Sequence, residues 1–548
     1  MRSGHPRQRS PNPGPLFARV VQGLLRPGAY PHPVRRVREI QTHVSAILLA
    51  GDFAYKLKKP VRFPFLDMSS LSQRKHLCEE EVRLNRRLSP ALYLGVVPIV
   101  ESAAGMRVGG EGTPVEYAVR MHRLPEDRMM DRLLRRGELR TEAVERLAEL
   151  IADFHARVES GPAVAVFGSP EAVRLLWDEH FAQTRRFLGR TLSAFQDHLL
   201  RATVRAWLIR KDAELRGRVS AGRIRDGHGD LRASSVCFTE PIQVFDCLDF
   251  APRYRCGDVA SEVAFLSMDL TLRGAAGLAR AFQHRYQERS GDRGMESLLP
   301  FYGCYRACVR GKVEGLRAGE REVPRRERAA AERLARRCFA VACHYARQDP
   351  PPLVLVTCGL SGTGKSTLAA ALAENLGCAR ISSDVVRKEL HHLAPGEHAP
   401  AAPGEGLYAE EVTRATYTEL VARARRWLAT GRSVILDATF QRHWQRALAV
   451  ELARAQGSLL FFLELRAPDA TVRARLRARA RDETAVSDAD WAVYVAQKAA
   501  WEPFHAPAFQ HLTIRARGSP ESVERDALAA LHLRLDPAPP APRREARS

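Results

Sequence analysis

The sequence predicts two domains of different fold class in one chain: an α+β domain, followed by an α/β domain with a parallel, doubly wound sheet. At 548 residues, the chain is too long for a single hydrophobic core. A long helical pattern stops at Asp349-Pro-Pro-Pro352, because proline cannot continue a helix. Beyond these prolines, strand-like runs alternate with helical ones, which is typical of a parallel sheet. We therefore expect a first domain at 15–348 (small lobe about 40–120, large lobe about 121–348), a linker at 349–352 and a second domain at 353–535.

The most specific motif lies at the start of the second domain. Leu353 to Cys358 is an apolar run typical of a short buried strand, and a helical pattern follows from Leu368. Between them the chain matches G-x-x-x-x-G-K-[ST], and a strand before and a helix after disfavour a chance match. In such a P-loop, backbone N–H groups surround phosphate oxygens, the lysine reaches the β- and γ-phosphates and the serine hydroxyl binds Mg²⁺. The motif predicts nucleoside triphosphate binding by Gly359, Leu360, Ser361, Gly362, Thr363, Gly364, Lys365, Ser366 and Thr367.

Two carboxylates follow strand-like runs of the second domain. Asp384 comes after the first of these runs, at the sheet edge where α/β proteins bind ligands. A helix N-cap is the alternative role for this residue. Asp437 ends the next run, and we interpret it as a ligand of Mg²⁺ or its waters, together with Ser366.

A helix expected at 471–481 carries five arginines. In P-loop kinases, a lid in this part of the chain closes arginines onto the phosphates. Arg473 and Arg477 are four residues apart and share one helix face, so we take them as the candidate lid residues. A solvated helix face is the alternative for some of the five.

The first domain carries a lysine, a glutamate and two aspartates in the chain order of a protein kinase. Residues 44–58 are typical of a β-hairpin whose second strand holds Lys56, and the charged helix that follows contains Glu81. Further on, His-Gly-Asp at 228–230 precedes a strand and then Asp246. In kinases, a Lys–Glu ion pair positions the phosphates and the two aspartates serve as base and metal ligand. The pattern favours a protein-kinase-like domain with two lobes.

Several segments of this domain follow the pattern of a known family: Thr42-His-Val-Ser, Tyr55-Lys-Leu-Lys-Lys-Pro60, Cys78-Glu-Glu-Glu-Val-Arg-Leu-Asn-Arg-Arg-Leu88, Tyr93-Leu-Gly-Val-Val-Pro98, Phe245-Asp-Cys-Leu-Asp-Phe250 and Asp258-Val-Ala-Ser-Glu-Val-Ala-Phe-Leu-Ser-Met-Asp-Leu270. From His43 to about Ala318, the chain resembles the bacterial aminoglycoside phosphotransferase-like proteins, in particular the branch fused to a C-terminal P-loop kinase. The resemblance implies that Lys56 contacts the nucleotide and that Glu81 pairs with Lys56. It also implies that Asp230 is the catalytic base and Asp246 the metal ligand.

The catalytic loop departs from this family. The family pattern is H-G-D-L-H-x-G-N, whereas this chain has Arg232 for the second His, Ser234 for the Gly and Ser235 for the Asn. That Asn binds the second Mg²⁺, and a serine hydroxyl is a shorter and weaker ligand than an amide oxygen. Fewer metal contacts leave more charge uncompensated on the transferring phosphoryl. The departure leaves two alternatives: a weakened or inactive lobe with a regulatory or substrate-presenting role, or an active one.

The second domain is similar to a group of small P-loop kinases. In addition to the P-loop, the segments that show this similarity are Ser383-Asp-Val-Val-Arg387, Val434-Ile-Leu-Asp-Ala-Thr439 and the arginine-bearing lid. The group includes gluconate kinase, the zeta-toxin kinases and the 5′-hydroxyl polynucleotide kinases. In polynucleotide kinases, an Asp-x-x-Arg element activates the acceptor hydroxyl and holds an anionic substrate. The resemblance implies these roles for Asp384 and Arg387.

Together, these motifs predict an ATP- and Mg²⁺-dependent kinase. The γ-phosphoryl of ATP would move to a hydroxyl of a small molecule or a polynucleotide end, mainly in the second domain. The alternative is an ATP-dependent switch or regulatory protein without a small-molecule product. The sequence does not name the acceptor.

Composition limits the kinds of partner and the cellular location that we expect for this protein. The net charge of +22 has two explanations: a polyanionic partner such as nucleic acid, or an arginine-biased composition with nucleotide sites, which we favour. Ten cysteines without paired C-x-x-C spacing predict reduced thiols. No signal-peptide pattern or membrane-length apolar run is found, so we expect a cytoplasmic protein without a membrane partner. We expect the tails 1–14 and 536–548 to be disordered, and the oligomeric state stays open.

Overall fold

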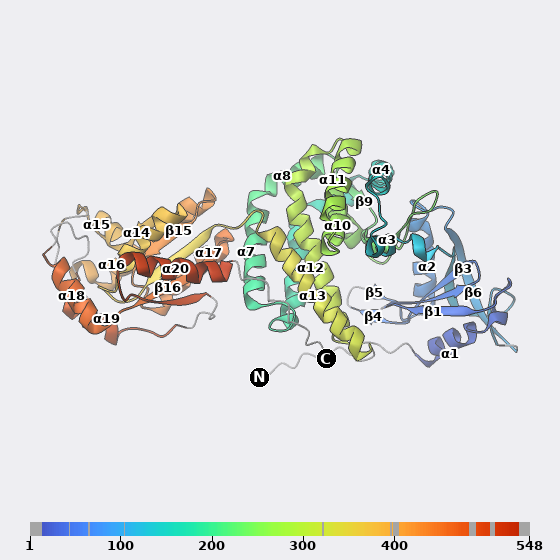
Figure 1. The fold of residues 1–548 in the computed structure, drawn as a ribbon, viewed down its shortest axis with the longest axis horizontal. Helices are drawn as coiled ribbons and strands as arrows, with labels where there is room; N and C mark the ends of the chain where they lie inside the picture. The colour runs from blue at the N-terminus through green and yellow to red at the C-terminus, as the bar shows by residue number, and fades with distance from the viewer. Residues whose placement is uncertain are drawn as a thin grey trace. The chain divides into compact units, whose positions relative to one another are not determined.

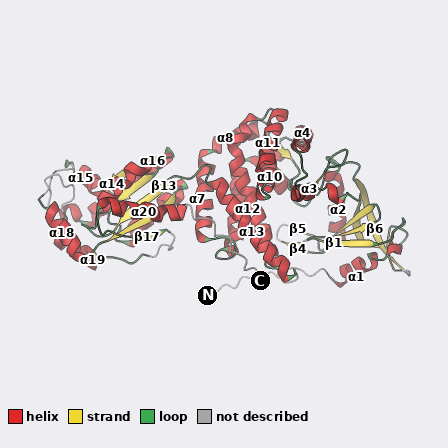
Figure 2. Cartoon of the chain, viewed as in Figure 1, coloured by secondary structure: helices red, strands yellow, loops and turns green. Residues whose placement is uncertain are grey.

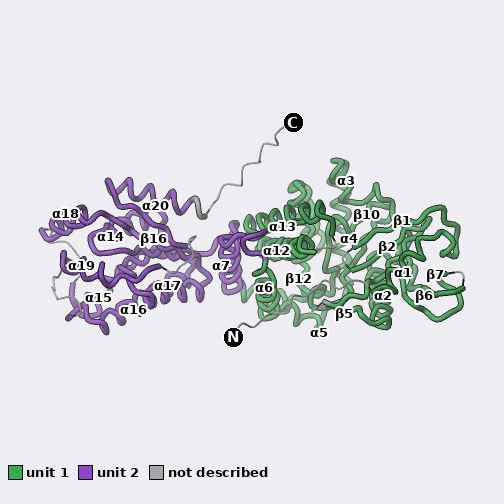
Figure 3. Tube along the Cα trace, turned by 90° about the horizontal axis from the view of Figure 1, so that it is seen from below, with its two compact units in different colours: residues 1–186, 212–345 green, residues 187–211, 346–548 purple. Residues whose placement is uncertain are grey.

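The computed structural model describes residues 14–42, 44–63, 66–103, 105–320, 323–394, 397, 405–481, 489–504 and 510–535. The chain forms two compact units, a first unit of residues 1–186 with 212–345 and a second unit of residues 187–211 with 346–548 (Figure 3). The boundary near residue 346 is close to the expected linker. The assignment of 187–211 to the second unit was not foreseen from the sequence. Apart from Gly14, the two expected tails lie outside the described residues.

The small lobe of the first unit is a six-stranded antiparallel sheet in the order β1-β2-β3-β8-β6-β7 (Figure 1). On one face, Tyr55 and Leu57 pack in one cluster with the apolar side of helix α1. Lys56 lies on the opposite face, toward helix α2, because strand side chains alternate. The elements are α1 Pro15–Leu24, η1 Pro27–Ala29, β1 Val37–Gln41, β2 Ser45–Ala50, β3 Phe53–Lys58, β4 Arg62–Phe63, β5 Leu66–Asp67, α2 Leu71–Asn85, β6 Tyr93–Ser102, β7 Gly105–Val108 and β8 Pro114–His122.

The large lobe is mainly helical and is built around a helix, α10, that is buried on nearly every side. Two short antiparallel pairs, β9–β12 and β10–β11, hold the loop that contains Asp230 and the residues that follow β11. The elements are η2 Glu126–Arg128, α3 Met130–Arg136, α4 Thr141–Arg157, α5 Pro162–Ala165, η3 Val166–Gly168, α6 Pro170–Thr184, α8 Asp212–Ser220, β9 Ile224–Asp226, η5 Ala233–Ser235, β10 Val236–Cys237, β11 Gln243–Val244, α9 Pro252–Arg255, β12 Cys256–Asp258, α10 Val259–Leu272, α11 Ala276–Ser290, η6 Arg293–Leu298, α12 Leu299–Arg317 and α13 Arg325–Ala346.

The second unit is a five-stranded parallel sheet in the order β14-β15-β13-β16-β17, with helices on both faces (Figure 2). This confirms the predicted parallel α/β fold. The apolar runs form the inner strands because a parallel sheet is buried on both sides. Strand β17 was not predicted. The elements are η4 Arg185–Phe187, α7 Ala194–Arg210, β13 Leu353–Cys358, α14 Lys365–Leu376, β14 Ala379–Ser382, α15 Ser383–Leu390, η7 Gly406–Tyr408, α16 Glu410–Ala429, β15 Val434–Asp437, α17 His443–Gln456, β16 Leu459–Arg466, α18 Asp469–Arg479, α19 Trp491–Ala499, β17 His511–Arg515 and α20 Pro520–Leu535.

Helix α7 packs against the second unit through close backbone contact. A Cβ on Gly457, at the end of α17, would lie 2.3 Å from the Ala206 backbone nitrogen. Arg205 donates to the Arg454 carbonyl at 2.6 Å, and the Trp207 indole donates to Asp349 at 2.6 Å. Glycine is required at this crossing, so the segment 187–211 is an integral part of the second unit.

Two further expectations concern the chain as a whole. All ten cysteines are buried and carry free thiols in the structure. In the described ranges, no helix is long and apolar enough to cross a membrane.

Candidate active sites

The P-loop of the second unit connects β13 to α14 with three glycines in conformations that other residues avoid. Gly359, Gly362 and Gly364 have φ values of 129°, 77° and 102°. A Cβ on Gly359 would lie 2.5 Å from a carbonyl oxygen of β16. The Lys365 ammonium donates to the Leu360 carbonyl at 2.9 Å, and burial lowers the pKa of Lys365. The loop is therefore closely packed, with its lysine folded back over it.

The two predicted metal ligands lie together at the end of this loop. The Ser366 hydroxyl donates to an Asp437 carboxylate oxygen at 3.2 Å. Arg380, which the sequence analysis did not select, donates to the other oxygen of Asp437 at 2.7 Å. A hydroxyl and a carboxylate are the oxygen ligands that Mg²⁺ prefers, and Mg²⁺ commonly takes its remaining ligands from water and phosphate. This pair fits a magnesium site.

Asp384 and the P-loop line the same cleft, which has a volume of about 1770 Å³. Asp384 stands in the first turn of α15, and its carboxylate accepts a hydrogen bond from Arg387 at 2.7 Å. Arg387 is 8% exposed and its guanidinium lies 5.1 Å from the centre of the Tyr408 ring. Its Nε atom is buried without a hydrogen-bond partner among the described residues. The cleft thus brings together a carboxylate and a cation that retains a donor without a partner among the described residues.

The arginines of α18 are placed differently from the prediction. Arg475 and Arg479 line the cleft, whereas Arg473 and Arg477 are exposed and do not. Arg473 instead lies 4.2 Å from the Trp491 ring centre. The buried residues of α18 set the rotation of this helix and so decide which of its arginines line the cleft. These buried residues are Val472 and Leu476, which pack against Leu360 of the P-loop.

In the first unit, the expected lysine–glutamate pair is present. Lys56 donates to Glu81 at 2.8 Å and to Asp246 at 2.7 Å. The charge of Lys56 lowers the pKa of Asp246 to about 2. A second lysine, Lys58, donates to Glu81 at 2.8 Å and also to Asp249, an arrangement that the sequence analysis did not predict. Each carboxylate of this cluster therefore has a lysine partner.

The predicted base, Asp230, is held by a residue that departs from the family pattern. Arg232 donates to both carboxylate oxygens of Asp230, at 2.8 and 2.6 Å. Ser235 accepts a hydrogen bond from the Arg232 backbone N–H at 3.0 Å and donates to its carbonyl at 2.8 Å. Its hydroxyl is thus occupied by the loop itself. Both oxygens of the Asp230 carboxylate are therefore occupied by the Arg232 guanidinium.

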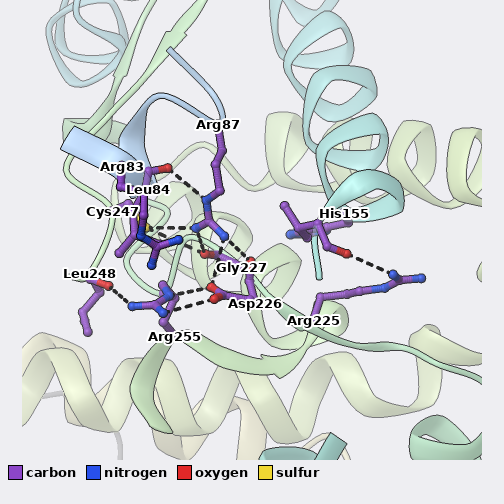
Figure 4. Close-up of polar contacts among 12 residues, drawn as sticks. Arg83, Leu84, Arg87, His155, Arg225, Asp226, Gly227, Cys247, Leu248 and Arg255 are labelled. Carbon is purple, nitrogen blue, oxygen red and sulfur yellow. Dashed lines mark hydrogen bonds and ion pairs between the residues drawn. The ribbon is translucent and has the colours of Figure 1, made fainter. Parts of the chain in front are cut away.

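Two further arginines fix the backbone around this loop (Figure 4). Arg87, just beyond α2, donates to the carbonyls of Asp226 and Gly227 at 2.8 and 2.7 Å. Arg255 donates to both carboxylate oxygens of Asp226, at 2.5 and 3.1 Å, and to the Leu248 carbonyl at 3.0 Å. Sequence spacing gave no signal for these contacts, because the partners are up to 140 residues apart.

Both units match the models of known protein families. Residues 61–301 match the model of the phosphotransferase enzyme family, and residues 354–504 match that of an AAA domain. The chain is thus a phosphotransferase or kinase enzyme with two domains.

The sequence match to relatives covers most of the chain. The chain is 33% identical over 475 residues to the uncharacterized protein Rv2004c of Mycobacterium tuberculosis (strain ATCC 25618 / H37Rv), and equally to Mb2027c of Mycobacterium bovis. The match covers 86% of this chain and 92% of each relative. The chain belongs to the family that includes these two-domain proteins.

Solved structures match about a third of the chain. A sugar kinase from Janibacter sp. HTCC2649 is 20% identical, with a TM-score of 0.26, over 33% of this chain and 95% of that one. A gluconokinase from Sinorhizobium meliloti 1021 is 19% identical, with a TM-score of 0.25, over 33% and 91%. The Mycobacterium tuberculosis APS kinase CysC, in complex with AMPPNP and APS, is 19% identical, with a TM-score of 0.25, over 33% and 99%.

Proposed function

We propose that the second unit transfers the γ-phosphoryl group of ATP to a hydroxyl of a small molecule or a polynucleotide end. The observation that carries this proposal is that the P-loop and Asp384 line the same cleft. A nucleotide held by the loop and an acceptor beside Asp384 would meet within it. Phosphoryl transfer needs mainly such positioning, together with positive charge around the transferred group.

The charges of this cleft are arranged for that transfer. Lys365, Arg475 and Arg479 supply positive charge on the phosphate side. Ser366 and Asp437 would hold Mg²⁺, which neutralises phosphate charge when bound. Phosphate oxygens would replace the Leu360 carbonyl as the partner of the Lys365 ammonium, because a charged acceptor binds an ammonium more strongly than a neutral one.

Asp384 is the candidate base on the acceptor side. The acceptor oxygen forms a bond to the γ-phosphorus while the bond from that phosphorus to the bridging oxygen breaks, and ADP leaves. The hydroxyl proton passes to the Asp384 carboxylate. Arg387 orients that carboxylate at 2.7 Å, and its unpaired Nε is available to an anionic group of the acceptor.

For the first unit, one observation favours a regulatory or substrate-presenting role over catalysis. Arg232 occupies both oxygens of the would-be base Asp230, and Lys56 pairs with the would-be metal ligand Asp246. Neither carboxylate is available without first giving up a cation. The second unit is therefore proposed as the main site of phosphoryl transfer. The competing function, an ATP-dependent switch, would use the same P-loop without an acceptor.

Two matched variants of the full chain test this proposal. Lys365→Ala should remove most ATP turnover, because it removes phosphate charge neutralisation, while Asp230→Ala should leave most of it. Turnover would be measured as ADP release, with and without a panel of hydroxyl acceptors. Turnover that survives Lys365→Ala but is lost in Asp230→Ala would place catalysis in the first unit. ADP release that no acceptor stimulates would favour the switch.

A further inference from the structure

A glutamine outside the P-loop is hydrogen-bonded to the loop backbone. Gln497 lies on α19, and its side-chain Oε1 accepts a hydrogen bond from the Ser361 N–H at 2.8 Å. The side chain also lines the cleft, together with the P-loop and Asp384. Nothing in the P-loop motif requires a glutamine more than 130 residues away.

Helix α19 is fixed in place by contacts that do not involve Gln497. The Tyr494 hydroxyl donates to Asp469 of α18 at 2.7 Å, and the Lys498 ammonium donates to both oxygens of Asp469 at 2.9 and 2.8 Å. Tyr494 is buried in the cluster that includes Leu360 of the P-loop. The loop, α18 and α19 therefore pack as one body, which holds the Gln497 backbone at a set distance from Ser361.

The partner atom settles which way the carboxamide points. A backbone N–H can only donate, so the carboxamide must present its oxygen to Ser361. Its NH₂ group is then not bonded to Ser361, and the described residues include no acceptor for it. An NH₂ group carries two donors and no acceptor, so it suits an anionic oxygen.

We propose that Gln497 is a catalytic residue whose NH₂ group donates to the non-bridging oxygens of the γ-phosphoryl during transfer. This inference rests on the proposed function of the second unit. Ser361 is the third residue of the loop, and it lines the cleft together with Lys365 and Arg475. As the bond from the γ-phosphorus to the bridging oxygen breaks and the bond to the acceptor forms, a donor held in advance stabilises the charge on these oxygens without reorganising.

The same hydrogen bond has a second interpretation, and the experiment must distinguish it from the first. Gln497 could instead occupy the Ser361 N–H in place of a phosphate oxygen and so hinder nucleotide binding. The two interpretations predict different effects of replacing Gln497. If Gln497 donates to the γ-phosphoryl, its removal lowers kcat. If Gln497 hinders nucleotide binding, its removal raises the affinity for nucleotide.

The experiment compares three variants of the full chain. Gln497→Leu removes both donors at similar size, Gln497→Glu retains an acceptor for Ser361 but places negative charge at the γ-phosphoryl, and Lys498→Ala keeps the carboxamide while weakening the attachment of α19. The readouts are kcat for ATP hydrolysis with water as acceptor and the dissociation constants of ADP and ATP by calorimetry. ADP lacks the γ-phosphoryl, so it reports damage to the loop alone.

We expect Gln497→Leu to lower kcat by about 10- to 100-fold, somewhat less than the loss of a rigid oxyanion-hole donor, with the ADP constant changed by less than about twofold. Gln497→Glu should lower kcat at least as much and weaken ATP relative to ADP. Lys498→Ala should keep kcat within about threefold, since the Tyr494–Asp469 hydrogen bond still holds α19 to α18 and an exposed ion pair contributes little.

Three results would overturn the inference. They are an unchanged kcat in Gln497→Leu, a parallel weakening of ADP that marks a structural role, and tighter nucleotide binding with the rate retained. If the wild-type chain neither binds ADP nor hydrolyses ATP, the proposed function itself fails, and the inference fails with it.

Discussion

Replacing Gly362 with alanine tests how closely α18 covers the P-loop. A Cβ at this position would lie 2.9 Å from a methyl group of Val472 and 3.0 Å from Leu476. Both side chains belong to the buried face of α18, so the helix must move away or the loop must distort. The backbone angle φ of 77° is unfavourable for any residue with a Cβ.

The structure separates these two costs. A left-handed backbone costs a non-glycine residue about 1–2 kcal/mol, and overpacking adds about 1–3 kcal/mol. Gly377, which caps the next helix, has a similar φ of 63° but no atom within 4 Å of its Cβ position. Gly377→Ala therefore meets only the backbone cost and is the matched control. The difference between the two variants should be about 1–3 kcal/mol.

Hydrogen exchange followed by mass spectrometry measures this difference locally, on the amides of α14. Relative to Gly377→Ala, we expect roughly 5- to 150-fold faster exchange in Gly362→Ala. ATP turnover should also fall in Gly362→Ala alone, because displacing α18 moves Arg475 and Arg479 away from the cleft. Equal exchange rates and equal turnover in the two variants would refute the view that α18 packs closely against the P-loop.

Two other perturbations follow from the same kind of contact. In a Lys365→Ala background, Arg232→His together with Ser235→Asn should raise Mg²⁺-dependent ATP turnover by at least about 100-fold, the low end of a general base contribution. Ser235→Asn alone should not, since Arg232 still holds Asp230, and an equal gain from it would contradict this account. Gly457→Ala should destabilise the crossing with α7 by about 2–5 kcal/mol and expose 187–211 to limited proteolysis. Cleavage in this segment at the wild-type rate would show that the crossing tolerates a side chain.

The sequence by itself determined the class of both domains and much of the nucleotide site. An apolar run such as Leu353 to Cys358 must be buried on both sides, and its neighbours in the sheet share that property. The P-loop is a local motif, since its three glycines and its lysine all lie between residues 359 and 365. The Lys56–Glu81 pair was also predictable. Strand β3 and the next helix, α2, pack together, and the two side chains meet at their interface.

Other features depend on contacts between distant parts of the chain. Arg475 and Arg479, rather than Arg473 and Arg477, line the cleft because the buried side of α18 packs on the P-loop and so sets the rotation of that helix. Spacing alone gives pairs of residues that share a face, but not the face that points inward. Arg380 reached Asp437 only because β14 and β15 are neighbours in the sheet.

The same holds for Arg232, on which the proposed role of the first unit depends, and for Gln497, on which the further inference depends. Arg232 is close to Asp230 in sequence, but only the folded loop shows that it takes both carboxylate oxygens. Gln497 lies more than 130 residues from Ser361, in a helix with no recognisable motif. The sequence encodes local conformation and the burial of apolar runs, whereas the partner of a polar side chain is decided by which surfaces those buried runs bring together.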